Sequence, residues 1–175
     1  MGILDSIDQA IVSAEQALIS DGARHVPPPA GTGELPTVRA LFIPVPTSEP
    51  VVEHQLPVDA EGDCSDAVRA LIRDMIERID VLDGVDFLCA DNAGVAEGLN
   101  LRATALMNAM KRTFAEGRFP GKTPEDPAFA LEEAALWATQ MRLVGSVVVI
   151  GVDPWGGWVS LPESTLVHAQ TLLGL

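Results

Sequence analysis

The side chains that could perform chemistry are few in this sequence and lie far apart. Its histidines are His25, His54 and His168, and its cysteines are Cys64 and Cys89. A metal site needs such ligands at close and regular spacing, and none of these residues shows it. The sequence therefore predicts neither a metal site nor a cofactor.

Nucleophilic catalysis would need a serine or cysteine beside a base and an orienting group. Ser146 follows a glycine but lacks the second glycine of a nucleophile elbow, and we consider His168 as its possible base. The Gly-rich motif of a phosphate-binding loop is absent. We predict no catalytic residue, and a hydrolase that uses Ser146 and His168 stays an alternative.

Four side chains are suited to holding an anionic ligand. Asn100 is placed to cap a following helix, whose N-terminal amides could bind an anion together with the Arg102 guanidinium. Asn92 lies in an Asp-Asn-Ala-Gly turn signature, and Trp155 in Asp-Pro-Trp-Gly-Gly-Trp could present its indole for stacking. The alternative for Asn100 and Arg102 is a helix cap with a surface ion pair. The alternative for the turn with Trp155 is that its second tryptophan, Trp158, packs in the core.

The formal net charge of −14 restricts the partners of the chain. It repels phosphate backbones and anionic lipid surfaces, so we expect neither nucleic acid nor a membrane as a direct partner. A basic protein surface or a small anionic ligand in a locally positive pocket remains, unless the charge serves solubility alone. Asp5 and Asp8 stand where a signal peptide would be basic, and two cysteines in a chain of this length form no disulfide framework, so we expect a cytoplasmic protein. The preference for Arg over Lys and the abundance of Ala indicate a GC-rich bacterial genome.

Residues 1–21 are predicted to form an amphipathic helix, tethered by a proline- and glycine-rich linker at 22–36. The apolar residues that share one face of this helix and are candidates for partner binding include Ile3, Ile7, Ile11 and Leu18. That face must be covered, either by the protein's own domain or by a partner or second copy.

Residues 37–175 are predicted to form one α+β domain. Strands are expected at 38–45, 51–56, 85–90, 144–152 and 158–161, and helices at 64–79, 101–114, 128–140 and 162–173. Hairpins outnumber crossovers in this order, so we expect a mixed, mostly antiparallel sheet of about five strands with helices on one face.

Short motifs in this domain are found at residues 38–44, 91–94, 98–103, 144–151 and 159–161. In these motifs the chain resembles a small domain of unknown function that is widespread in phages, plasmids and their bacterial hosts. The family typically has an acidic residue where Ala93 stands, and residues 104–142 are longer here. The resemblance implies a mobile-element accessory protein without an established activity.

These observations favour a protein that acts by binding and is not an enzyme. The resemblance implies counteraction of host defence, by sequestering a signalling nucleotide or by blocking a host protein. In the first case Asn100, Arg102 and Trp155 would help to hold the nucleotide. In the second case the acidic surface would occupy a basic patch on the host protein. The alternative is a structural protein that oligomerises or docks through its N-terminal helix.

Overall fold

The computed structural model of this protein describes residues 36–91 and 98–175. The chain divides at residue 35, and the unit Leu35–Leu175 holds every helix and strand described below. The predicted N-terminal helix with Ile3, Ile7, Ile11 and Leu18, the linker, and the candidate Asn92 lie outside the described residues.

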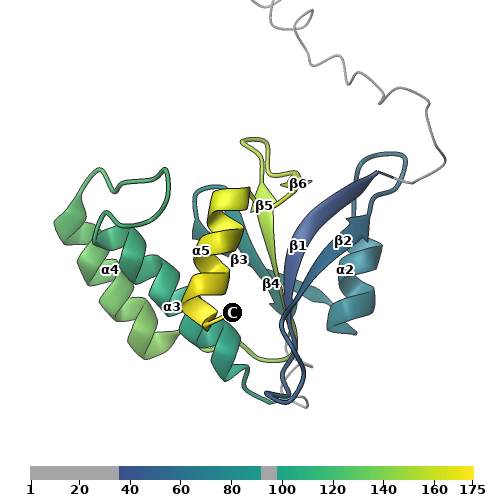
Figure 1. The fold of residues 1–175 in the computed structure, drawn as a ribbon, viewed down its shortest axis with the longest axis horizontal. Coiled ribbons are helices and arrows are strands. Elements are labelled where there is room, and N and C mark those ends of the chain that lie inside the picture. The colour runs from purple at the N-terminus through teal and green to yellow at the C-terminus, as the bar shows by residue number, and fades with distance from the viewer. Residues whose placement is uncertain (1–35, 92–97) are drawn as a thin grey trace, which may run out of the picture. The chain divides into compact units, whose positions relative to one another are not determined.

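The described part of the chain forms an antiparallel sheet and four helices (Figure 1). In chain order the elements are β1 (Thr37–Ile43), β2 (Val52–Pro57), α2 (Ser65–Ile72), β3 (Ile76–Leu82), β4 (Val85–Ala90), α3 (Leu101–Ala115), α4 (Pro127–Gln140), β5 (Val147–Val152), β6 (Trp158–Val159) and α5 (Glu163–Leu173). The strand order is β2-β1-β5-β4-β3, and β6 pairs with β5; every pairing is antiparallel. The predicted α+β class is confirmed. None of these helices is long and apolar enough to cross a membrane.

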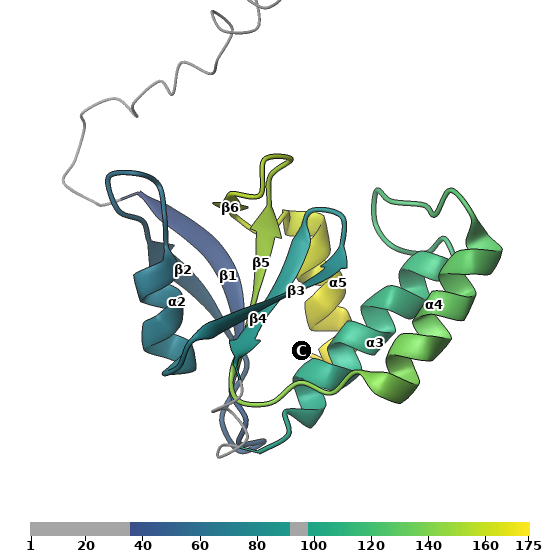
Figure 2. The same ribbon diagram turned by 180° about the vertical axis from the view of Figure 1, so that it is seen from behind.

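The sheet is covered on both faces, so the expectation of helices on one face was wrong (Figures 1 and 2). Val147 and Val149 of β5 pack with α3 and α5 on one side. Val148 and Ile150 pack with α2 on the other side. All four side chains are fully buried, as a continuous β-branched run in a central strand requires.

The predicted helix at 64–79 was also wrong, because α2 ends at Ile72 and β3 begins at Ile76. Arg73 adopts a left-handed backbone conformation (φ 61°) that stops the helix. The helical spacing of Met75 and Ile79 with earlier apolar residues was misleading. Met75 is 65% exposed, and the following residues pair with β4 along nearly its whole length. The ladder with β4 satisfies their backbone groups, and this outweighs helix propensity.

Helices α3 and α4 are joined by a buried cation. Lys111 is 8% exposed, and its Nζ lies 2.9 Å from Oε1 of Glu133 and 4.2 Å from the ring centroid of Trp137. A buried lysine needs such partners, since its unpaired charge would be costly. The pair fixes which side of α4 faces α3.

We predict that Gly151→Ala strongly destabilises the fold. A Cβ at this position of β5 would lie 2.7 Å from the carbonyl oxygen of Ser160 and 2.9 Å from that of Val159. Both are backbone atoms held close to β5, so the strand must shift. The free energy of unfolding, measured by urea denaturation, should fall by at least about 2 kcal/mol. An unchanged midpoint would contradict this close approach.

The stability of the protein should also depend on the protonation of His168. Its Nε2 lies 3.0 Å from Oγ1 of Thr113, and its ring packs edge-on against Phe119. Burial lowers the pKa of His168, and the charge of Arg118 adds to this effect. The unfolded pKa of about 6.5 is then the higher one. The contribution of neutral His168 to the free energy of unfolding is therefore fully present above the unfolded pKa. It is lost as the pH falls through that pKa toward the lower pKa of the folded state.

Urea denaturation across this pH range checks the expectation, with His168→Gln as the reference. The free energy of unfolding of the wild type should fall relative to the variant as the solution is acidified. Parallel profiles for the two proteins would show that His168 does not contribute.

Candidate functional site

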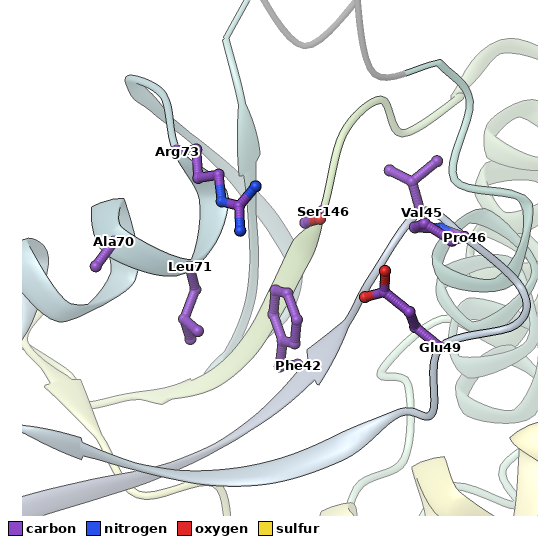
Figure 3. Close-up of a pocket in the computed structure, with 8 residues that line it drawn as sticks. All are labelled: Phe42, Val45, Pro46, Glu49, Ala70, Leu71, Arg73 and Ser146. Atoms are coloured by element: carbon purple, nitrogen blue, oxygen red, sulfur yellow. The ribbon is translucent and has the colours of Figure 1, made fainter.

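A cleft of about 390 Å³ opens on the α2 face of the sheet (Figure 3). It lies between the last turn of α2, the β1–β2 loop and the start of β5. Its lining residues are Phe42, Val45, Pro46, Glu49, Ala70, Leu71, Arg73 and Ser146. This volume is in the range of sites for small molecules.

Arg73 contributes the positive charge of the cleft. Its backbone (φ 61°, ψ 27°) occupies the left-handed position that ends α2, and its N–H donates to the carbonyl of Arg69 at 2.7 Å. Glycine is the usual residue there, and the conformation costs an arginine roughly 1 kcal/mol. Such outliers concentrate at functional sites, which makes Arg73 a candidate binding residue.

The guanidinium of Arg73 is not used by the fold. Among residues 36–91 and 98–175, it is the one arginine or lysine side chain that makes neither a hydrogen bond nor an ion pair. Figure 3 shows it extending over the cleft. It is therefore available to a ligand.

The opposite side of the cleft carries a negative charge. The carboxylate of Glu49 extends into the cleft from the β1–β2 loop, facing the side from which Arg73 extends (Figure 3). Between them lie the apolar side chains of Phe42 and Leu71 and the residue Ser146. This arrangement suits a ligand with an anionic group at one end, an apolar middle, and N–H donors at the other end.

Asn100 is bonded to residues next to the cleft lining and is not itself part of that lining. Its predicted role as helix cap is confirmed, because Oδ1 accepts a hydrogen bond from the N–H of Ala103 at 3.0 Å. Its Nδ2 donates to the carbonyls of Ile43 (2.9 Å) and Gly145 (3.1 Å). The side chain is fully buried and fully engaged, so it holds the end of β1 next to the segment that leads into β5.

Arg102 anchors the β1–β2 loop. It donates to the carbonyls of Pro44 and Pro46, at 2.7 and 2.8 Å, and to that of Glu49 at 2.7 Å. These bonds replace the surface ion pair that we considered for this residue. Since Pro46 and Glu49 line the cleft, Arg102 positions one wall of it.

Trp155 lies apart from these residues. It is 88% exposed in the turn between β5 and β6, where Oδ1 of Asp153 accepts hydrogen bonds from the N–H groups of Trp155 (2.9 Å) and Gly157 (2.8 Å). The six residues of β5 separate this turn from Asn100 and Arg102, a length of roughly 20 Å. The structure does not bring Trp155 into one site with them. Trp158 is half-buried against the α2-side core.

Ser146 and His168 belong to opposite faces of the sheet. Ser146 precedes β5 and lines the cleft on the α2 side. His168 lies on α5 and contacts Thr113 and Phe119 on the α3 side. The sheet between them prevents the nucleophile and base pairing that we considered.

Neither cysteine of the described residues is an activated thiolate. Burial, with nearby carboxylates, raises the pKa of Cys64 to about 11 and that of Cys89 to about 12. A reactive thiol needs the opposite shift. Within residues 36–91 and 98–175, no cluster of three or more His, Cys, Asp or Glu side chains could hold a metal ion.

Sequence reasoning missed Arg73, Glu49 and Phe42 as site residues. Arg73 fell inside the predicted helix at 64–79, and no glycine or proline marks the end of α2. Glu49 is one of many carboxylates in the chain. No signal in the sequence links these positions, because tertiary contacts bring them together.

Comparisons of the chain with protein-family models, with curated proteins and with solved structures found no match.

We predict that Asn100→Ala costs about 3 kcal/mol of unfolding free energy, from one lost cap and two orphaned buried carbonyls. Asp126→Ala is the matched control, since Asp126 caps α4 at an exposed position. The control should cost about 1 kcal/mol. Urea denaturation of both variants measures the difference, and equal losses would show that the bonds to Ile43 and Gly145 contribute nothing.

Proposed function

We propose that this protein acts by binding, without catalysis, and that its ligand is a small molecule whose anionic group pairs with Arg73. The unpaired guanidinium of Arg73, held over a cleft at a strained backbone position, supports this proposal most strongly. The arginine costs stability where a glycine would not, and ligand binding accounts for its presence.

The cleft chemistry favours a nucleotide with few negative charges. A phosphate would pair with Arg73, and a base would rest on Phe42 and Leu71. Glu49 would accept hydrogen bonds from N–H groups of the base, for which guanine is well suited. The Glu49 carboxylate and the net charge of −14 disfavour polyphosphates.

In the setting that the resemblance implies, the protein is an accessory factor of a phage or other mobile element in the bacterial cytoplasm. Holding a signalling nucleotide in the cleft would then withhold it from a host defence system. Asn100 and Arg102 serve this activity as positioning residues, because their contacts are to the backbone that carries the cleft wall.

The substitution Arg73→Gly tests the proposal through two opposite effects. The fold should gain up to about 1 kcal/mol of unfolding free energy, since glycine adopts the left-handed conformation without strain. Guanosine monophosphate, titrated calorimetrically into the full-length protein, should bind at least about tenfold more weakly to the variant.

Arg69→Gln is the matched control, because Arg69 lies on the same helix and its guanidinium pairs with Asp66 on the surface. It removes the same charge and should leave nucleotide affinity almost unchanged. The proposal fails if the wild type binds no nucleotide, or if both variants bind it as tightly as the wild type does.

A further inference from the structure

Helix α4 exposes apolar side chains to an unusual extent. Of its 14 residues, only Ala130 and Ala134 are buried, while Phe129 is 64%, Leu131 47% and Leu136 52% exposed. A helix that is apolar on all sides is normally enclosed by other elements. Yet among the described elements α4 packs mainly on α3, at the edge of the domain (Figures 1 and 2).

A groove of about 530 Å³ runs between α4 and α3, and of the three exposed apolar residues Leu131 lines it, while Phe129 and Leu136 lie on the outer face of α4. Its lining side chains are mostly small and apolar: Asn108, Ala109, Arg112, Leu131, Ala134, Ala135 and Ala138. The Oδ1 atom of Asn108 is buried and meets no hydrogen-bond donor in the described part of the chain. A rotation of the Asn108 side chain would let an occupant of the groove supply that donor.

The charges that α4 itself carries are acidic. Glu125 and Glu132 form no ion pair in the described structure, and α4 contains no basic residue. Arg112 is already bound to Oε1 of Glu116 at 3.1 Å. Arg142, beyond the end of α4, donates to the carbonyls of Ala138 and Met141.

We propose that the α3–α4 groove and the exposed face of α4 bind an amphipathic helix of another protein, with an aliphatic stripe flanked by Lys and Arg. Charge complementarity selects this occupant. A second copy would bring the same acidic residues and a net charge of −14. The predicted N-terminal helix carries Asp5, Asp8 and Glu15 beside its apolar residues, and is disfavoured for the same reason. This surface shares no residue with the cleft.

The test uses the full-length protein and a synthetic amphipathic helix of leucine and lysine, titrated by calorimetry. The double substitution Leu131→Asn with Leu136→Asn removes apolar contacts without changing the charge. It should weaken binding of this helix at least about tenfold. A helix in which glutamate replaces each lysine should not bind.

Val167→Asn is the matched control, because Val167 on α5 is 50% exposed and lies outside the groove. It should bind the leucine and lysine helix as the wild type does, and circular dichroism should show all variants folded. If the double variant binds the helix as tightly as the wild type does, binding depends on charge attraction and not on these apolar contacts, and the proposal is overturned. It is also overturned if the lysine helix does not bind, or if light scattering shows a wild-type dimer that the double substitution dissociates.

Discussion

Two side chains at the start of α3 donate hydrogen bonds to five backbone carbonyls in the β1–β2 loop, at the end of β1 and just before β5. Asn100 binds the carbonyls of Ile43 and Gly145, and Arg102 binds those of Pro44, Pro46 and Glu49. A carbonyl without a donor is costly where it is buried, as at Ile43 and Gly145, and the prolines in this loop provide no N–H of their own. The conformation of the β1–β2 loop therefore depends on the position of the first turn of α3. The cleft wall, the end of β1 and the approach to β5 all depend on this constraint.

The buried sheet separates the chemistry of its two faces. Strand β5 sends alternate side chains to two cores, one closed by α2 and the other by α3 and α5. The cleft belongs to the first face, and α4 packs outside the second. A ligand near Arg73 and a protein on α4 would therefore contact different residues, and a substitution in one site leaves the other intact.

The elements that carry their own local signals were predictable from the sequence. Strand β4 was predicted with its observed bounds, and Asn100 was recognised as the cap of α3 from its type and position. The break after Ile72 was not predictable, because Arg73 takes a conformation that usually signals itself through glycine. The side of the sheet on which each helix packs was missed as well, because local periodicity does not encode it.

The candidate site was predicted only indirectly. Asn100 and Arg102 were selected because amide and guanidinium groups at a helix start bind anions, and they do bind oxygen atoms there. Those oxygen atoms belong to the protein itself. An asparagine or arginine that can donate hydrogen bonds to an anionic ligand can equally donate them to a backbone carbonyl. The tertiary structure determines which of the two lies within reach. The unengaged guanidinium of Arg73 is likewise a property of the fold, which gives each other arginine and lysine of the described structure a partner.

The excess negative charge of the protein repels the anionic ligand proposed for the cleft and attracts the basic helix proposed for α4. At physiological ionic strength a charge acts over about 8 Å, so Arg73 attracts an anion only at close range while the rest of the surface repels it. Ligands with many negative charges are thereby rejected, and a ligand with one or two is held by contact. The same surface attracts a basic helix from a distance and speeds its encounter with α4. The same charge distribution thus favours a basic protein, permits a nucleotide with one or two negative charges, and disfavours nucleic acid at both sites.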